Sequence, residues 1–258
     1  MDGTYLYDTH AHLDDEMFDG DRAAVIEKIR NSGVGRLNNI GSDMQSSRIS
    51  IELAEKYDFI YAAVGVHPSE TGGMTDADID ELRRMAAHKK VVAIGEIGLD
   101  YHYEDTERET QKYWLRRQLE LVRELDMPVV IHDRESKGEC MEILKEKGIS
   151  NGVIHCFSGS AETAAEFLKM GFHISFTGVL TFKNAKKAIR ALEAIPMERL
   201  LIETDCPYMA PEPFRGTRND SSLVYRVAEK IAEVKGVSVE DTVRITCENA
   251  LRLFKVGE

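Results

Sequence analysis

Cysteine is scarce in this chain of 258 residues, and its distribution excludes two kinds of small stabilised domain. No two cysteines form a C-x-x-C pair, so neither a zinc knot nor a disulfide framework is indicated. Reduced thiols in a cytoplasmic protein fit this pattern best. The four cysteines are scattered along the chain, at Cys140, Cys156, Cys206 and Cys247.

Long apolar runs and a leader-like beginning are also missing. No window approaches the roughly 18 consecutive apolar residues that indicate a membrane span, so no membrane contact is expected. The first residues, MDGTYLYD, contain neither a basic n-region nor an apolar h-region, and no secretory signal is visible. Both features favour a cytoplasmic location.

Positive charge is in deficit, with 33 Lys and Arg against 45 Asp and Glu and a net charge of −12 at pH 7. Proteins that coat nucleic acid are basic overall, so tight non-specific duplex binding is not expected. A nuclease is not excluded, because divalent metal ions bring their own positive charge to a site. Nucleic acid is therefore expected as a substrate rather than as a stably bound partner.

Strand-like and helix-like segments alternate regularly along the chain. Amphipathic stretches such as "QKYWLRRQLELVRELD" have the helical spacing of apolar residues and separate short apolar runs. Eight strands, each followed by a helix, in about 250 residues predict an α/β fold, the closed (β/α)8 TIM barrel. No linker divides the chain, so one domain over residues 1–258 is expected. The predicted strands are 5–7, 36–40, 60–64, 91–94, 128–131, 152–154, 172–176 and 200–202.

The end of the first strand and the C-terminus refine this prediction. A doubly wound open sheet is the alternative fold, but no G-x-G-x-x-G or P-loop follows the first strand. The final stretch, "SVEDTVRITCENALRLF", predicts an additional C-terminal helix that packs outside the barrel.

Polar side chains with metal-ligand chemistry follow successive strands. In "YDTHAHLDD", the two-residue period of a strand places Asp8, His10 and His12 on one face. Each such residue taken singly could be a turn residue or a helix cap. In a barrel, however, all strands end at one mouth, where active sites of this fold are built. The candidate ligands are His10, His12, Glu96, His132, His155 and Asp205, with His67 at the same rim.

Six nitrogen and oxygen ligands are more than one metal ion needs. A pair of divalent ions bridged by a carboxylate would use all of them. The histidines suit Zn²⁺, Mn²⁺, Fe²⁺ or Ni²⁺, whereas Mg²⁺ prefers oxygen ligands, so the metal is left open.

At this point the chain resembles the TatD-like family of metal-dependent hydrolases, best known as deoxyribonucleases. The resemblance runs nearly end to end and places the two H-x-H histidines and Asp205 on the first metal. It implies that Glu96 bridges to the second metal, whose ligands are completed by His132 and His155. The matching blocks are "DTHAHLD", "GVHP", "AIGEIGLDY", "PVVIHDRE", "VIHCFSGS", "GFHISFTG", "ETDCPYMAP" and "RGTRN".

Departures from the family pattern are few. "GVHPSE" lacks a second histidine after the proline, and Thr217 in "RGTRN" stands where a lysine is common. Cys206 stands where relatives often have serine. Because Cys206 follows Asp205 and Cys156 follows His155, strand alternation turns both thiols away from the ligands. We interpret both cysteines as packed residues.

The expected chemistry is hydrolysis by metal-activated water. Two cations lower the pKa of a bridging water, and Asp205 is placed to accept its proton, so Asp205 and Glu96 are the predicted catalytic residues. Planar guanidinium groups at the rim could pair with phosphate oxygens. For Arg134, an ion pair with a carboxylate at the protein surface is an equally good interpretation. His67 is either a donor to phosphate or a structural histidine. The candidate substrate-binding residues are His67, Arg134, Arg215 and Arg218.

Three functions stay open. The resemblance implies a nuclease that acts exonucleolytically on single-stranded DNA. The second is another binuclear-metal hydrolase, such as an amidohydrolase of cyclic amides or a deacylase of aminoacyl-tRNA esters. Barrel amidohydrolases often bridge their metals with a carbamylated lysine at the end of strand 4. This chain has Glu96 at the corresponding position, which makes an amidohydrolase less favoured without excluding it. The third is a metal-binding scaffold without turnover. The sequence leaves open the polarity of digestion, the preference for DNA or RNA, and the roles of His67 and His102. It also leaves the oligomeric state open, although a monomer fits.

A layer beneath the ligands is also expected. Glu203 lies two residues before Asp205, and Asp8 lies two before His10, so both should point into the barrel and lie near each other. Buried like charges need partners. For at least one carboxylate, the expected partner is a ligand imidazole, joined to it by a hydrogen bond.

Overall fold

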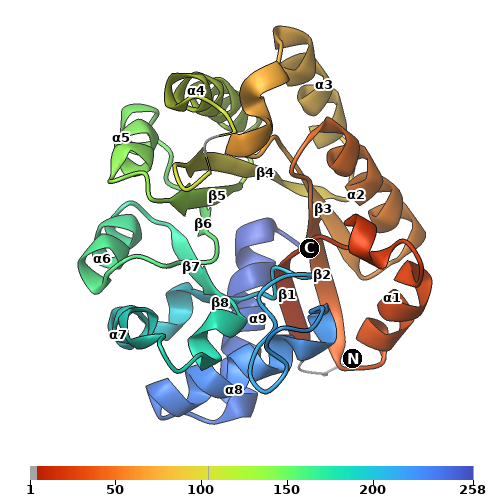
Figure 1. Ribbon diagram of the computed structural model, residues 1–258, viewed down its shortest axis with the longest axis vertical. Coiled ribbons are helices and arrows are strands. Elements are labelled where there is room, and N and C mark those ends of the chain that lie inside the picture. The colour runs from red at the N-terminus through yellow and green to blue at the C-terminus, as the bar shows by residue number, and fades with distance from the viewer. Residues whose placement is uncertain (1–4, 104, 258) are drawn as a thin grey trace.

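A computed structural model describes residues 5–103 and 105–257, and its centre is a ring of eight parallel strands (Figure 1). Neighbours in the chain are neighbours in the sheet, in the order β1 to β8. The strands are β1 (Leu6–Ala11), β2 (Val34–Ile40), β3 (Ile60–Val64), β4 (Val91–Asp100), β5 (Val129–Arg134), β6 (Gly152–Ile154), β7 (His173–Phe176) and β8 (Leu200–Ile202).

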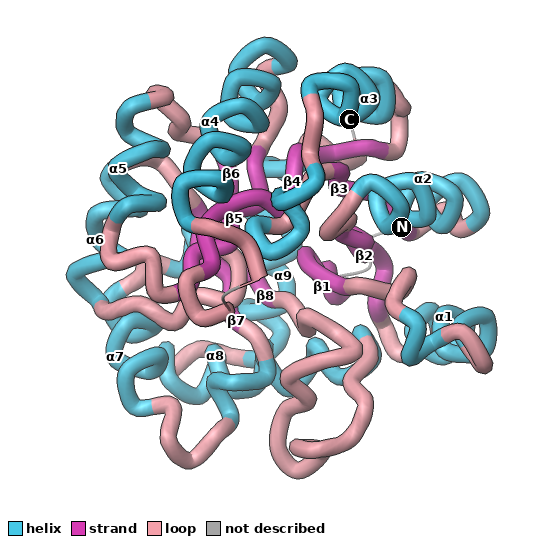
Figure 2. The backbone as a smooth tube through the Cα atoms, turned by 45° about the horizontal axis from the view of Figure 1, so that its top comes forward, coloured by secondary structure: helices cyan, strands magenta, loops and turns pink. Residues whose placement is uncertain are grey.

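Helices cover the outside of the ring (Figure 2). An α-helix follows each strand, as the alternation of the sequence predicts, and short 3-10 turns occupy several of the connections. None of these described helices combines the length and the apolar character that crossing a membrane requires. The α-helices are α1 (Arg22–Arg30), α2 (Met44–Lys56), α3 (Asp76–Ala86), α4 (Arg108–Leu125), α5 (Glu139–Glu146), α6 (Ala161–Lys169), α7 (Lys186–Ala194), α8 (Val224–Lys235) and α9 (Val239–Phe254).

The ring closes between β1 and the segment that follows β8. Ala11 and Cys206 form a parallel bridge. The Asp205 N–H donates to the His10 carbonyl at 2.9 Å, and the His12 N–H donates to the Cys206 carbonyl at 2.8 Å. The predicted (β/α)8 barrel is confirmed, and its seam is made by the backbone of three candidate ligands.

Three strands are longer than the sequence predicts. The apolar runs end at residues 7, 94 and 131, but β1, β4 and β5 continue to residues 11, 100 and 134. Hydrophobicity underestimates these strands, because ligand-type polar side chains begin where the apolar runs stop. The added residues include His10, Glu96 and His132, so strand backbone carries all three side chains, with register shifts in β1 and β4 at the first two.

The C-terminal helix α9 closes the amino end of the barrel. Its expected place was outside the barrel, and it lies behind the strand ring in the view of Figure 1. Its buried side chains join those of the strands in one apolar cluster, with the rings of Phe254 and Tyr7 centred 6.2 Å apart. The barrel interior therefore continues into α9 at the end opposite the mouth. The strand residues in this cluster include Tyr7, Ile40, Ala63, Val130, Val153 and Leu201, and the α9 residues are Cys247, Ala250, Leu253 and Phe254.

Candidate metal centre

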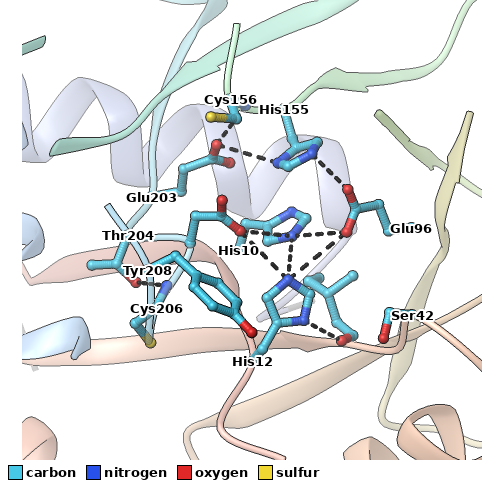
Figure 3. Close-up of polar contacts among 12 residues, drawn as sticks. His10, His12, Ser42, Glu96, His155, Cys156, Glu203, Thr204, Cys206 and Tyr208 are labelled. Carbon is cyan, nitrogen blue, oxygen red and sulfur yellow. Dashed lines mark hydrogen bonds and ion pairs between the residues drawn. The ribbon is translucent and has the colours of Figure 1, made fainter. Parts of the chain in front are cut away.

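The six predicted ligands converge at the carboxyl end of the strands. Figure 3 shows the imidazoles of His10, His12 and His155 turned toward the carboxylate of Glu96. The six come from β1, β4, β5 and the turns that follow β1, β6 and β8, so segments distant in sequence meet only through the barrel. The two groups that they form each surround one oxygen of Glu96.

The first group contains the H-x-H pair. The Nε2 atoms of His10 and His12 lie 3.1 Å apart. Oε2 of Glu96 lies 3.4 Å from His10 Nε2 and 3.8 Å from His12 Nε2. Oδ1 of Asp205 lies 3.6 Å and 3.4 Å from the same two nitrogens. Two nitrogens and two oxygens therefore face one small volume.

The second group uses the other oxygen of Glu96. Its Oε1 lies 2.7 Å from His132 Nδ1 and 2.7 Å from His155 Nε2. These two ring nitrogens are 3.0 Å apart. One buried carboxylate thus presents a different oxygen to each of two histidine pairs.

This arrangement fits divalent metal ions. Nitrogens 3.0–3.1 Å apart have nearly the spacing of two neighbouring ligands that each lie about 2.0–2.1 Å from one cation. Without a cation, two imidazoles facing each other this way must share a proton. Both histidine pairs, each together with Glu96, form groups able to hold a metal. The donor set of imidazole nitrogen and carboxylate oxygen suits transition metals.

Both carboxylates are held in the ionised form. Burial would raise the pKa of Glu96, but the neighbouring imidazoles, His155 first, outweigh burial and hold it well below its usual range. Burial likewise opposes ionisation of Asp205, while contact with His12 and the charge of His10 lower its pKa. Burial would lower the pKa of His12, yet contact with Asp205 raises it to about 9. Ionised carboxylates are the state that metal binding requires.

Three of the four imidazoles are oriented through their second nitrogen. His12 Nδ1 lies 2.9 Å from the carbonyl oxygen of Ile40. His132 Nε2 lies 2.9 Å from Oδ2 of Asp100. Since an acceptor at one ring nitrogen fixes a proton there, the other nitrogen of each ring, which faces Glu96, is the one that a metal ion would bind.

The third orienting contact places Glu203 beside a ligand imidazole, as expected of the lower layer, but without the predicted hydrogen bond. Oε1 of Glu203 lies 3.6 Å from His155 Nδ1, a charge contact longer than a hydrogen bond. Glu203 is buried and also accepts from the Cys156 N–H at 2.6 Å (Figure 3). It accepts from the Ser175 hydroxyl at 2.6 Å as well. These bonds satisfy the buried carboxylate and aim it at the imidazole.

Asp8, the other carboxylate of this layer, has the partners that its burial requires, but they are not imidazoles. Its carboxylate accepts from the N–H and hydroxyl of Thr204 at 2.9 and 2.6 Å, and at 3.3 Å from the backbone N–H of His10. No hydrogen bond or ion pair joins it to an imidazole in the described part of the chain. The pairing of β1 with β2 shifts register on both sides of this residue, between Leu6 and Tyr7 and after Asp8. The alternation of side chains between the two faces of the strand therefore fails here. Asp8 instead binds Thr204, in the connection that follows β8.

Asp100 was missed by the sequence interpretation. It is buried at the end of β4, and its Oδ1 accepts from the His102 N–H at 2.8 Å. A detectable signal existed, because Asp100 is four residues after Glu96 and a longer strand would place both on one face. At Gly98, between them, any side chain would collide with the backbone carbonyl of His132. This glycine lets β4 approach β5 closely enough for Asp100 to reach the ring.

His67 faces the site and also begins a turn. Its Nε2 lies 3.8 Å from Oε1 of Glu96, and its ring is centred 4.4 Å from that of His132. Its Nδ1 accepts from the Ser69 N–H at 3.2 Å, which leaves the ring proton on Nε2. Burial and the nearby His132 lower the pKa of His67 to about 3, so the ring is neutral. His67 is thus a hydrogen-bond donor that faces the metal ligands.

The three candidate arginines lie in different surroundings. Arg134 is half-buried beside His132 and stacks on Tyr103, with its guanidinium carbon 5.1 Å from the ring centre. Arg215 is exposed and lies 4.4 Å from the ring centre of Phe182. Arg218 is bound to Asp21 by two bonds of 2.6 and 2.8 Å. Arg134 therefore borders the ligands, whereas Arg218 is already paired.

The two cysteines beside the ligands are protonated, and Cys206 is a packed residue as predicted, whereas Cys156 is only half-buried. Burial raises the pKa of the Cys156 thiol well above its usual range and raises that of Cys206 as well. Cys206 is fully buried, with its sulfur 3.8 Å from the Ser221 hydroxyl. Neither thiol is a thiolate nucleophile.

A (β/α)8 barrel whose mouth gathers imidazoles and carboxylates able to hold a metal defines a metal-dependent hydrolase. The family model described as TatD related DNase matches residues 7–255, and the chain belongs to this family. The resemblance seen in the sequence blocks is thereby confirmed.

Three relatives cover nearly the whole chain. An uncharacterized metal-dependent hydrolase, YabD of Bacillus subtilis, is 47% identical over 98% of this chain and 100% of its own length. The 3'-5' ssDNA/RNA exonuclease TatD of Musicola paradisiaca is 32% identical over 98% of this chain and 99% of its own. The crystal structure of YjjV, a TatD homologue from Escherichia coli, superimposes with a TM-score of 0.92 at 32% identity, covering 99% of this chain and 100% of that one.

Proposed function

We propose that this hydrolase cleaves phosphodiester bonds of single-stranded DNA, exonucleolytically, with two divalent metal ions. The observation that carries the proposal is the position of Glu96, whose two oxygens face two separate histidine pairs. In this proposal the H-x-H pair and Asp205 hold one ion, His132 and His155 hold the other, and Glu96 bridges them. The exonuclease TatD of Musicola paradisiaca, 32% identical, supports the choice of substrate.

The bound ions would supply a hydroxide near neutral pH and a positive surface for a phosphate oxygen. The chain's own residues do the rest. Asp205 directs Oδ1 at the H-x-H nitrogens, and we assign its second oxygen to accept the proton of the attacking water. His67 donates from Nε2 to a nonbridging phosphate oxygen, and the guanidinium of Arg134 pairs with another.

The rim of the mouth supports a single-stranded substrate. Five of the eight exposed large apolar side chains in the described residues lie on connections that follow strands. Bases of a single strand stack on such side chains, whereas those of a duplex are covered. Arg134 and Arg215 stack on neighbouring rings and add positive charge beside them. The five rim residues are Met17, Tyr103, Tyr208, Met209 and Phe214.

All proposed ligands come from one chain, so we propose that a monomer suffices for activity. A single hydrolase domain over residues 1–258 remains the proposal, with residues 1–4, 104 and 258 outside the described part. The cytoplasmic location stays a prediction. Nucleic acid enters the proposal as substrate only.

Digestion of end-labelled single-stranded DNA across Mg²⁺, Mn²⁺, Zn²⁺, Fe²⁺ and Ni²⁺ tests the function. Stepwise shortening that chelation abolishes is expected, and Asp205→Ala should be inactive. Asp80→Ala, on the exposed face of α3, is the matched control and should cleave normally. Metal-loaded protein that leaves DNA intact but hydrolyses a cyclic amide or an aminoacyl ester would overturn the proposal in favour of the second hydrolase class.

A further inference from the structure

A pocket of about 350 Å³ opens directly beside the candidate metal centre. His132, His155 and Asp205 form one of its walls. The rest of the lining comes from the carboxyl ends of β5 and β7, from the connections after β6, β7 and β8, and from the start of α7. A chemical group in this pocket would touch the same side chains that are proposed to hold the metals. The volume lies within the range of about 300–1,000 Å³ that small-molecule sites occupy.

The floor of the pocket is apolar. Phe157, Phe176 and Leu180 line it and are themselves almost fully buried, so the floor is preformed by the core. The rings of Phe157 and Phe176 meet edge to face, with centres 6.2 Å apart. Met209 lies at the mouth, 38% exposed, with its sulfur 3.4 Å from that of Cys156. Thioether sulfur makes favourable contacts with aromatic rings.

The rim of the same pocket is polar and positively charged. Two cationic side chains line the pocket: Arg134 comes from the end of β5 and Lys187 from the start of α7. The exposed amide of Asn184 adds a donor and an acceptor, and the hydroxyl of Thr177 lines the wall. An apolar floor with amide and hydroxyl groups above it matches a planar ring that has apolar faces and polar edges.

Resting on the proposed function, we propose that this pocket binds one base of the DNA chain, from a nucleotide that flanks the scissile phosphate. The base enters between Met209 and the apolar floor, and its edge meets Asn184 and Thr177. Arg134 and Lys187 lie where the attached phosphate backbone leaves the pocket. An aliphatic acyl group would fill the floor but would offer no polar edge to the exposed amide of Asn184.

This assignment makes single-strandedness a requirement of the site itself. A base inside the pocket is unstacked and unpaired, so a duplex must open its terminal pair first. The rim side chains can then hold the bases farther along the strand. The pocket therefore contributes both affinity and the preference for a single strand.

Equilibrium binding of nucleotides to the metal-loaded protein tests the pocket without turnover. Calorimetry with Mn²⁺ compares dTMP and dAMP with 2-deoxyribose 5-phosphate, which has the same sugar and phosphate but no base. The base should raise affinity by roughly 5–100-fold. Val179, half-buried in the pocket wall, gives the blocking variant Val179→Trp, which should remove this gain while 2-deoxyribose 5-phosphate binds as before.

Val237→Trp is the matched control, because Val237 is an exposed valine outside the pocket. It should keep the full gain from the base. If Val179→Trp does not fold, Met209→Ala serves as the second variant and should reduce the gain by roughly two- to fivefold. Equal affinity of the wild type for dTMP and 2-deoxyribose 5-phosphate would overturn the pocket assignment, as would a full gain from the base in Val179→Trp.

Cleavage of single-stranded DNA with one abasic residue beside the terminal phosphodiester separates this inference from the proposed function. Slow cleavage at the abasic position with normal cleavage elsewhere supports both. Fast cleavage everywhere retains the nuclease and rejects the base pocket. Base-dependent nucleotide binding without any cleavage retains the pocket and rejects the nuclease.

Discussion

Asp100 holds His132 from the side of the ring away from Glu96. Its Oδ2 lies 2.9 Å from Nε2, while Oε1 of Glu96 lies 2.7 Å from Nδ1 of the same ring. Burial opposes ionisation of Asp100, but the bond to His132 lowers the pKa of Asp100 to about 2. The carboxylate therefore fixes both the ring orientation and the nitrogen that faces the second metal position.

Asp100→Asn should weaken the second metal position selectively. An amide in place of the carboxylate removes the charge that holds the Nε2 proton, and orienting partners of this kind are worth about 10–100-fold in metal affinity. Metal titration with calorimetry should show one tight and one weakened ion. Asp58→Asn, an exposed aspartate paired with Arg30, is the control. Two ions bound with wild-type affinity in Asp100→Asn would contradict the positioning role.

The candidate ligands could be predicted from sequence, whereas Asp100 was missed, and the fold explains the difference. Each ligand follows a short apolar run, and a barrel brings the ends of all such runs to one mouth. Asp100 lies six residues beyond the apparent end of its strand, after two glycines that lower strand propensity. The extension exists because β4 pairs with β5 from Ile97 to Asp100, a non-local contact without a local signal.

Three other features could not be predicted from local sequence patterns, because they also depend on non-local contacts. The closure of the barrel floor by α9 depends on packing between Phe254 and Tyr7, residues at opposite ends of the chain. The position of Asp8 depends on two register shifts in β1. The pocket beside the metal centre is assembled from two strand ends, three connections and one helix, so none of the sequence blocks that contribute to it indicates a pocket by itself.

Changing Asp205 to Asn should affect turnover more than metal binding. The amide keeps one oxygen for the first metal position but cannot accept the proton of the attacking water. Loss of a general base costs of order 10²–10⁴-fold in kcat. Single-turnover cleavage at saturating metal, together with metal content, measures both effects. Near-normal kcat in Asp205→Asn would show that the proton goes elsewhere.

Removing Glu96 should have the opposite signature. Its two oxygens face both histidine pairs, so Glu96→Ala should lower the occupancy of both metal positions together. Metal content by elemental analysis should fall from two ions toward none at a metal concentration that saturates the wild type. Retention of one tightly bound ion in Glu96→Ala would show that the two positions are independent.

His173 should make the fold less stable in acid. Burial, and then the charges of Arg199 and Arg252, lower its pKa to about 4 from 6.5. Below pH 6.5 the unfolded chain binds a proton here that the folded chain does not, so stability is lost as pH falls toward 4. The loss amounts to at most about 3 kcal/mol in the free energy of unfolding.

Urea unfolding of the wild type and His173→Asn between pH 7.5 and pH 4.5 measures this effect. The variant lacks the titrating ring, so its stability should decline less steeply, and losses from other groups cancel in the comparison. His88→Asn, on the α3–β4 connection, controls for removal of a histidine. Parallel declines in the wild type and His173→Asn would show that His173 does not control the acid limit.

Mutation at the amino end of the barrel, where α9 packs, should reduce stability without reducing activity at the mouth. Phe254 is 2% exposed and packs in the cluster that α9 shares with the strands, so Phe254→Ala should cost about 3–5 kcal/mol of unfolding free energy. Tyr225→Ala, at a side chain 42% exposed on α8, should change stability by no more than about 0.5 kcal/mol. The metal centre lies at the opposite end, so kcat on single-stranded DNA should stay near wild type in folded Phe254→Ala at low temperature. A large fall in kcat with metal content unchanged would mean that α9 also sets the geometry of the mouth.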